Sequence, residues 1–172
     1  DSDSVDEVIA VGGSRYAICD LQIDYCQPFD MPEGIEMVDV AVADVDGDIL
    51  REAVFLFNDE NNQRTLHVEN FDAEESGTEE SWELAVDTDI HRIAAGDIDG
   101  DGRAEIVTLE EGGWMNVTDD LLDVYRLIDL ADGSQLERIS DQSSGFSHIV
   151  DIAIGDTNAD EVAELLVLDE NN

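Results

Sequence analysis

The residues of this chain best suited to chemistry are acidic side chains that alternate with small residues in a short stretch. Residues 97–105 read Asp-Ile-Asp-Gly-Asp-Gly-Arg-Ala-Glu. Hard cations such as Ca²⁺ take six to eight oxygen ligands at about 2.3–2.6 Å, and a tight loop with this spacing can supply most of them. Gly100 and Gly102 allow the backbone to curl so that the carboxylates converge. The predicted ligands are the side chains of Asp97, Asp99, Asp101 and Glu105 and the main-chain carbonyl of Arg103.

This pattern recurs along the chain, with oxygen-bearing side chains at positions one, three, five and nine of each loop. In residues 44–52 the predicted ligands are Asp44, Asp46, Asp48 and Glu52, with the carbonyl of Leu50. In residues 156–164 they are Asp156, Asn158, Asp160 and Glu164, with the carbonyl of Val162. At the N-terminus Asp1, Asp3 and Glu7 match the later positions of a loop without its first acid. The complete loops start at residues 44, 97 and 156, that is, 53 and then 59 residues apart, and periods near this length indicate propeller-like arrays.

The segments around the loops repeat as well. Each complete loop follows an alternating stretch, typical of a half-buried strand, and precedes an apolar run that fits a strand buried on both faces. The alternating stretches are Val38-Val40-Val42, Ile93-Ala95 and Val150-Ile152-Ile154, and the apolar runs are Ala53–Phe57, Ala104–Leu109, Val162–Leu168 and, after the N-terminal half-pattern, Val8–Val11. Further strands are expected at Arg64–Glu69, Ser81–Val86, Leu121–Leu130 and Gln135–Ile139. The repeating unit is therefore about four strands with one ion loop between the first and the second.

The block Asp-x-Asp-Gly-Asp-Gly-Arg-x-Glu between two strands resembles the FG-GAP repeat, the integrin α type also called VCBS, of calcium-binding β-propellers. The resemblance extends over nearly the whole chain and implies several Ca²⁺ ions, one in each loop. The chain departs from it at Ile49 and Glu161, which replace a glycine at position six, and at Asn158, which removes one charge. The closing acid is Glu, where the family more often has Asp. Because a left-handed conformation strongly disfavours a β-branched residue, Ile49 predicts a changed turn or a weaker site.

We therefore expect an all-β fold, a β-propeller-like array of about four-stranded blades with a Ca²⁺ loop between the first and second strands. One repeat region would span residues 1–172, with a partial blade 1–36, blades 37–88 and 89–148, and a partial blade 149–172. This set is incomplete, because known propellers close with about four to eight blades. The chain is then either a segment of a longer array or one of several copies that associate through open strand edges.

The acidic loops allow two other interpretations, a solvated turn and an EF-hand. A solvated Asp-Gly turn is common in any acidic protein, but recurrence in register before apolar strands argues against it. An EF-hand needs an acid at position twelve and a helix on both sides, and Thr108 occupies that position in the clearest loop. The EF-hand is rejected.

The charge balance is extreme: 45 acidic residues stand against seven arginines, and the formal net charge is −38. Self-repulsion on this scale destabilises a compact state at low ionic strength, and salt screens it. An acid-rich, lysine-free composition resembles that of proteins from salt-in halophiles, so we predict a halophilic source. A disordered acidic chain is the rival, but 42% hydrophobic content with regular strand patterning argues against it. Without a basic patch, nucleic acid and anionic membrane surfaces are disfavoured as partners.

The two cysteines, Cys19 and Cys26, have a spacing that suits a bridge across a hairpin in an oxidising exterior, and two separate thiols fit equally well. A zinc site is not expected, because the sequence has no C-x-x-C and no nearby histidine. Asn116-Val-Thr118 matches the N-glycosylation acceptor pattern, which is informative only for an exported protein. No signal peptide or membrane span is visible, so we expect a processed or trimmed chain without membrane insertion.

Enzyme signatures are thin, and we predict that the chain is not an enzyme. His67, His91 and His148 are scattered, and the sequence has no G-x-S-x-G or H-E-x-x-H frame. The close carboxylates of the loops could serve acid–base chemistry, but metal ligation explains their spacing better.

Three functions are therefore considered. The first is an extracellular or cell-surface calcium-binding propeller segment with a structural, adhesive or protein-interaction role, in which the opposite face or rim binds a protein or glycan. The second is the propeller of a secreted polysaccharide-active enzyme, which a cleft gathering Trp82, Trp114 and Tyr125 with an acid and a base would favour. The third is a surface-filament subunit whose open strand edges are filled by the next copy.

Overall fold

The computed structural model describes residues 8–20, 25–31, 33–70, 81–110, 120–130, 133–145, 148–160 and 162–170. This part of the chain is all-β and contains no helix, and thus no helix able to cross a membrane. Its strands are β1 (Val8–Gly12), β2 (Arg15–Asp20), β3 (Tyr25–Asp30), β4 (Glu36–Ala43), β5 (Glu52–Asn58), β6 (Arg64–Glu69), β7 (Ser81–Val86), β8 (Ile90–Gly96), β9 (Glu105–Glu110), β10 (Leu121–Leu130), β11 (Gly133–Ser143), β12 (Ile149–Gly155) and β13 (Glu164–Asp169).

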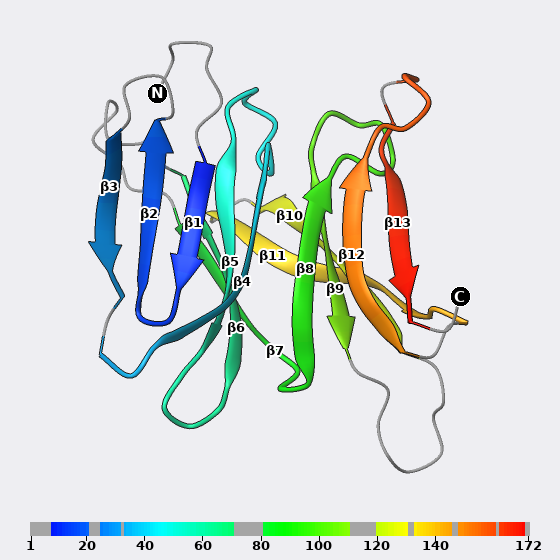
Figure 1. Cartoon of the computed structure of the whole chain (residues 1–172). Coiled ribbons are helices and arrows are strands. Elements are labelled where there is room, and N and C mark those ends of the chain that lie inside the picture. Colours follow the sequence, from blue (N-terminus) through cyan, green and yellow to red (C-terminus); the bar gives the residue numbers. More distant parts are fainter. Residues whose placement is uncertain are drawn as a thin grey trace.

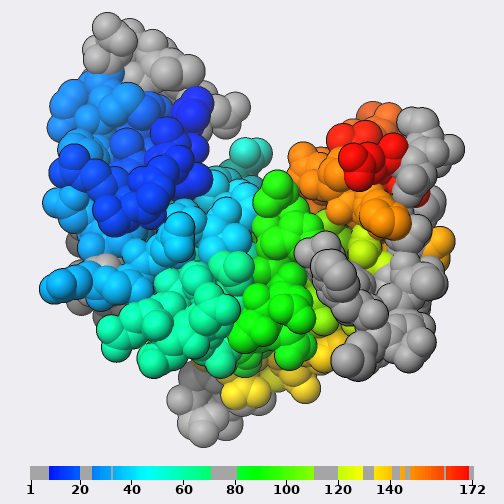
Figure 2. Space-filling model, turned by 60° about the horizontal axis from the view of Figure 1, so that its bottom comes forward, coloured from blue at the N-terminus to red at the C-terminus, as the bar shows by residue number. Residues whose placement is uncertain are grey.

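The strands form four antiparallel sheets, none of them closed, in which consecutive strands pair. These sheets are β1–β3, β4–β7, β8–β11 and the hairpin β12–β13. The opening strands of successive sheets lie side by side, because β1 contacts β4, β4 contacts β8, and β8 contacts β12. The sheets thus follow one another along an open arc from the blue N-terminal sheet to the red C-terminal hairpin (Figure 1). In the space-filling view these two ends are separate lobes on either side of the green β8 region (Figure 2).

The strand ranges expected from the sequence are largely confirmed. β6, β7 and β10 begin and end at the expected residues, whereas β11 runs longer than the expected Gln135–Ile139. The expectation that all four apolar runs are buried on both faces is correct only for β5 and β9, whose residues 53–56 and 105–109 are all buried. It is wrong for β1 and β13, which are mostly exposed or half-buried. These two strands belong to the end sheets, so they lack a neighbouring sheet on one side.

The core lies between the sheets, in three clusters. The largest fills the space between the second and third sheets, and Leu56, Leu66, Ile90 and Ile106 are fully buried in it. A second cluster, around Leu109 and Ile152, joins the third sheet to the fourth, and a third, around Phe55 and Tyr16, joins the first sheet to the second. Because β5 and β9 each face two neighbouring sheets, alternate residues of the same strand enter different clusters. This explains why their sequences are continuously apolar.

The opening strands share a local irregularity. β4, β8 and β12 each carry a bulge near the start, between Met37 and Asp39, between Ile90 and Arg92, and between Ile149 and Asp151. A bulge re-aims the side chain next to it. The carboxylate of Asp39 accepts a hydrogen bond from the N–H of Ile93 in the next sheet at 2.9 Å. The bulge in β4 therefore helps to tie the second sheet to the third.

The N-terminal sheet holds the only two cysteines of the chain. Cys19 in β2 lies directly opposite Cys26 in β3, and the two form a disulfide. The choice between a bridge and two separate thiols, which the sequence left open, is thus decided in favour of the bridge. The covalent link stabilises a sheet that has little buried surface of its own.

Candidate metal centres

The three complete acidic loops occupy the same place in successive sheets. Residues 44–52 connect β4 to β5, residues 97–105 connect β8 to β9, and residues 156–164 connect β12 to β13. In each loop the closing glutamate is the first residue of the second strand. Asp1, Asp3 and Glu7, predicted as ligands of an N-terminal remnant, lie outside the described residues. We call the three complete loops the first, second and third loop.

Wherever the structure describes them, positions four and six of the loops have a left-handed backbone whatever the residue there; Glu161, at position six of the third loop, lies outside the described residues. At position four φ is +83° for Gly47, +77° for Gly100 and +63° for Ala159. At position six φ is +92° for Gly102 and +74° for Ile49. The changed turn expected at Ile49 is therefore wrong: the loop keeps its course, and Ile49, with 88% of its surface exposed, adopts the disfavoured conformation. The weaker site, the other expectation for Ile49, stays a prediction.

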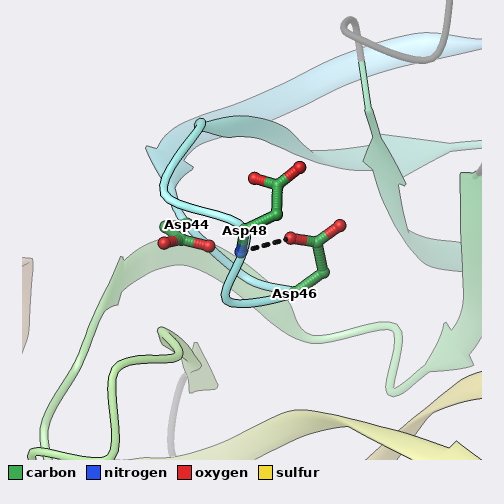
Figure 3. A group of neighbouring side chains, drawn as sticks. All are labelled: Asp44, Asp46 and Asp48. Atoms are coloured by element: carbon green, nitrogen blue, oxygen red, sulfur yellow. Dashed lines mark hydrogen bonds between the residues drawn. The ribbon is translucent and has the colours of Figure 1, made fainter. Parts of the chain in front are cut away.

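Backbone N–H groups hold the aspartates of the first loop in place. Asp44 accepts hydrogen bonds from the N–H of Gly47 at 2.7 Å and from that of Ile49 at 2.9 Å. Asp46 accepts one from the N–H of Asp48 at 3.0 Å, drawn as the dashed line in Figure 3. The second loop has the same hydrogen bonds. Asp97 accepts from the N–H of Gly100 at 2.6 Å and of Gly102 at 2.8 Å, and Asp99 accepts from the N–H of Asp101 at 3.1 Å. The alternating acids are thus held by hydrogen bonds within their own loop, which do not involve the rest of the fold.

The aspartates converge closely enough to hold one ion in the first two loops. In each, the residues at positions one, three and five offer oxygens that all lie within 4.8 Å of one another; these residues are Asp44, Asp46 and Asp48, and Asp97, Asp99 and Asp101. The third loop has Asn158 at position three, so its only acids at the predicted ligand positions are Asp156, Asp160 and Glu164, and among the described residues these three do not form such a group. Hard oxygen donors in this arrangement fit Ca²⁺ better than a softer transition metal.

The closing glutamate is anchored in the same way in all three loops. Its Oε2 accepts a hydrogen bond from the N–H of position two, at 2.7 Å in Glu52, 3.1 Å in Glu105 and 2.8 Å in Glu164. Glu52 and Glu105 are almost completely buried. The other oxygen, Oε1, faces a different environment in each loop, and this is the main difference between them.

In the first loop, Glu52 Oε1 is buried and has no hydrogen-bond partner among the described residues. A buried carboxylate oxygen without a partner is costly, because it loses water and gains nothing in return. The pKa of Glu52 is raised to about 7: burial is the main cause, the hydrogen bond from the N–H of Val45 opposes the rise, and the charges of Asp46 and Asp48 add to it. The first loop therefore combines three converging carboxylates with a fourth that needs a positive partner.

In the second loop, an arginine supplies that partner. Arg126 in β10 donates from Nε to Glu105 Oε1 at 2.8 Å, and its guanidinium also pairs with Asp99 and lies 3.7 Å from Asp101. Burial raises the pKa of Glu105, and the hydrogen bond from Arg126 opposes this rise. Sequence reasoning missed Arg126, because it lies 21 residues beyond the closing glutamate and belongs to no loop motif.

In the third loop, the partner is an amide. Asn158 Nδ2 donates to Glu164 Oε1 at 2.6 Å, and Thr157 Oγ1 donates to the Oε2 of the same glutamate at 2.7 Å. This loop is more exposed than the other two, and its glutamate is only half-buried. The third loop is thus satisfied internally, with one charge fewer than the others.

Successive loops are also joined to one another. The N–H of Ala104, at position eight of the second loop, donates to the carbonyl of Asp44 at 2.7 Å, and the N–H of Ala163 does the same to Asp97 at 2.8 Å. At Gly47 an added Cβ would lie 2.9 Å from the side chain of Arg103, which shows how closely the second loop packs on the first. The three loops therefore form one connected row along the sheets.

A further acidic group was not predicted from the sequence. Asp87 after β7, Glu110 at the end of β9 and Asp123 in β10 offer oxygens within 4.8 Å of one another. Asp123 is buried and paired with Arg138 at 2.6 Å. No local spacing signals this group, because its members come from three separate segments. It lies at the end of β9 that is remote from the second loop, since Glu105 opens that strand and Glu110 closes it.

The residues considered for catalysis do not gather in the described structure. His67 bonds to Glu69 and Glu83 on its own sheet, at 2.7 and 2.9 Å. Trp82 and Tyr125 both belong to the main core cluster. A groove of about 520 Å³ between β7, β10 and β11 is lined by Gln63, Leu84, Ala85, Val86, Asp87, Tyr125, Leu136, Glu137 and Arg138. Trp114 and the predicted glycosylation acceptor Asn116 lie outside the described residues.

A scan against protein-family models found no family that matches this chain, and a search of curated proteins found no match either. The chemistry of the loops, rather than a relative, therefore has to carry the functional conclusion.

Proposed function

We propose that this chain is a calcium-binding β-propeller segment that acts outside the cell, and that Ca²⁺ in its acidic loops stabilises the junctions between successive sheets. One observation carries the proposal: Glu52 Oε1 is buried without a partner among the described residues, beside three aspartates whose oxygens converge within 4.8 Å. A cation bound there would satisfy the glutamate and offset the repulsion among the aspartates.

The first loop would hold Ca²⁺ through Asp44, Asp46, Asp48 and Glu52, with the carbonyl of Leu50 as a further ligand. A bound Ca²⁺ supplies a fixed double positive charge and accepts six to eight oxygens at about 2.3–2.6 Å. The protein's own contribution is to hold the acids in place with backbone N–H groups and to exclude water from Glu52. The second and third loops would bind in the same manner through Asp97–Glu105 and Asp156–Glu164.

The propeller arrangement is supported by the order of the sheets. The opening strands lie side by side, each sheet carries its loop between its first and second strands, and equivalent hydrogen bonds join one loop to the next. We propose partial blades 1–36 and 149–172 around blades 37–88 and 89–148, in keeping with the resemblance to FG-GAP repeats. A row of cations along such an array would set the angle between blades.

An extracellular setting is supported by the disulfide between Cys19 and Cys26, because disulfides persist in oxidising compartments. Calcium loops of modest affinity are also filled there more readily than in a cytoplasm. The role we propose is structural: a rigid array that presents a rim or face to a protein or glycan at the cell surface.

The proposal is tested by thermal unfolding in high KCl, with excess Ca²⁺ compared with excess EGTA. Binding to the folded state at a hundredfold excess over the dissociation constant adds about 2.7 kcal/mol per site to the free energy of unfolding. We expect a marked rise in melting temperature with Ca²⁺, which Asp48→Asn reduces. Glu60→Gln removes one charge from an exposed turn and serves as the matched control. An equal melting temperature in Ca²⁺ and EGTA would show that the loops are solvated turns and would overturn the proposal.

A further inference from the structure

We infer that Arg126 is a built-in counter-ion of the second loop, so that this loop is stabilised without metal and binds Ca²⁺ more weakly than the first loop. The inference rests on the proposed function, since it ranks the calcium sites that the function requires. It also makes a claim about the metal-free protein that can be tested separately.

The contacts of Arg126 place its charge among the predicted ligands. Its guanidinium contacts Glu105 Oε1, Asp99 Oδ2 and Asp101 Oδ2, which belong to three of the four predicted side-chain ligands of the second loop. The arginine side chain is only 25% exposed, so water screens these interactions less than it would at the surface. A planar guanidinium with several donors is well suited to bridge carboxylates in this way.

The second sheet has a different residue at the equivalent position. Tyr125 pairs with Ile106, the residue after Glu105, and Glu69 pairs with Ala53, the residue after Glu52. The residue after Tyr125 is Arg126, and the residue after Glu69 is Asn70. Asn70, which directly follows β6, is therefore the counterpart of Arg126 in β10.

Asn70 makes the corresponding contact without a charge. Its Nδ2 donates to Asp46 Oδ2 at 3.3 Å, just as the guanidinium of Arg126 donates to Asp99, the position-three acid of the second loop. The neutral amide leaves Glu52 Oε1 without a hydrogen-bond partner among the described residues. One difference between two equivalent strand ends, Arg126 or Asn70, thus separates a loop whose closing glutamate is bridged by a guanidinium from a loop whose closing glutamate oxygen has no such partner among the described residues.

This difference has opposite effects on stability and on affinity. In the absence of metal, Arg126 bridges the acids of the second loop and offsets their repulsion, whereas at Asp46 of the first loop the nearby charge of Arg103 offsets less than the neighbouring Asp44 and Asp48 add. When Ca²⁺ binds, Arg126 must give up its contacts with the ligands and stays nearby as a like charge. Like charges at this range repel near a protein surface, and high salt reduces the repulsion. A difference in affinity of at least about tenfold is therefore expected between the loops.

The test exchanges the two residues. Arg126→Asn gives the second loop the amide of the first, and Asn70→Arg gives the first loop the guanidinium of the second. Calorimetric Ca²⁺ titration in high KCl measures each loop alone, in backgrounds where Asp160→Asn and either Asp48→Asn or Asp101→Asn silence the other two. We expect Arg126→Asn to tighten the second loop at least about tenfold and Asn70→Arg to weaken the first by a similar factor.

Unfolding in EGTA provides a readout that does not depend on calcium. Arg126→Asn should lower the melting temperature and Asn70→Arg should raise it. Arg64→Asn is the matched control for charge, because Arg64 donates to the carbonyl of Thr88 and contacts no loop carboxylate in the described structure. Arg126→Lys keeps the positive charge but loses the planar guanidinium. The second loop of this variant should therefore bind Ca²⁺ nearly as weakly as that of the wild type.

The outcomes separate the two proposals. If neither loop of the wild-type chain binds Ca²⁺, the proposed function and the ranking of the loops both fail. If Ca²⁺ binds but Arg126→Asn changes affinity and melting temperature no more than Arg64→Asn, the inference is overturned and the proposed function stands. Should Arg126→Asn not fold, Asn70→Arg decides, because an unchanged affinity of the first loop would overturn the inference.

Discussion

The first loop and the group formed by Asp87, Glu110 and Asp123 each gather three acids, but by different means. In the first loop the acids lie two residues apart and are held by N–H groups of the same nine-residue segment. In the group of Asp87, Glu110 and Asp123, the three acids come from a turn and two strands, and they lie close together only because the sheets pack against each other. The loop leaves Glu52 Oε1 buried without a hydrogen-bond partner among the described residues, while the packed group contains an ion pair between Asp123 and Arg138.

The two acidic groups differ in where their neutralising charge comes from. A group that already contains an arginine is partly neutralised by the protein itself, whereas under our proposal the first loop takes up a cation from solution. With only seven arginines in a chain of net charge −38, their positions matter more than their number. Arginines at the second loop and at Asp123 therefore mark acidic groups that are stable without metal.

The largest expected effect comes from Glu52→Gln. The amide keeps the size of the side chain, removes the buried charge and offers a donor to the neighbouring aspartates. In EGTA, we expect the variant to be more stable than the wild type. With Ca²⁺, it should lose the stabilisation that ion binding in the first loop gives, about 2.7 kcal/mol in the free energy of unfolding at a hundredfold excess over the dissociation constant. Denaturant unfolding with Ca²⁺ and with EGTA measures both changes. A variant that is stabilised by Ca²⁺ as much as the wild type would contradict the assignment of Glu52.

The next effect concerns the packed group. Arg138→Met removes the partner of the buried Asp123, and we expect a loss of about 2 kcal/mol, reduced from the cost of a fully buried pair because Arg138 is partly exposed. Asp123→Asn in the same chain should restore most of it. Excess Ca²⁺ should not rescue Arg138→Met. Full rescue by Ca²⁺ would show that this group is also a cation site and would remove the contrast with the loop.

The pH dependence of stability should be smaller, at most about 1.4 kcal/mol per pH unit for each proton. Burial raises the pKa of Glu110 and of Asp123, and the nearby Asp87 adds to both shifts while Arg138 opposes them. Between the ordinary and the raised pKa values, the folded state binds more protons than the unfolded state. Stability therefore falls as pH rises through this window, so lowering the pH from neutrality toward the ordinary carboxyl pKa in EGTA should stabilise the protein.

This measurement is cleanest in the Glu52→Gln background, where Glu52 no longer titrates. Adding Glu110→Gln should flatten the dependence further. An unchanged slope in that double variant would mean that Glu110 is not responsible.

The smallest effect is expected at Ile49, whose left-handed conformation costs about 1–2 kcal/mol. Its side chain is exposed, so Ile49→Gly loses little packing and relieves the strain, although glycine gains entropy in the unfolded chain. We expect a net stabilisation of about 0.5–1 kcal/mol in EGTA. Thermal unfolding of Ile49→Gly is compared with that of Gly102→Ile, which should destabilise the second loop by a similar amount. Destabilisation by Ile49→Gly would show that Ile49 makes contacts that its exposure does not suggest.

The sequence predicted much of the fold because strand periodicity and turn chemistry are local properties. The all-β structure, the strands β6, β7 and β10 and the placement of each loop between two strands follow from alternation and from Asp-Gly spacing. The burial of β1 and β13 was overestimated, since a run of apolar residues does not tell how many sheets cover it. The changed turn expected at Ile49 was wrong for a different reason, because hydrogen bonds within the loop outweighed the conformational preference of the residue.

What the sequence determined by itself is the shape of each loop, since acids at positions one, three and five bond to N–H groups only a few residues away. What the tertiary structure decided is the charge that each loop encounters. The register of a third strand brings Arg126 to the second loop and Asn70 to the first, and sheet packing brings Arg138 to Asp123. These contacts join residues that are distant in the chain, so no local spacing could reveal them.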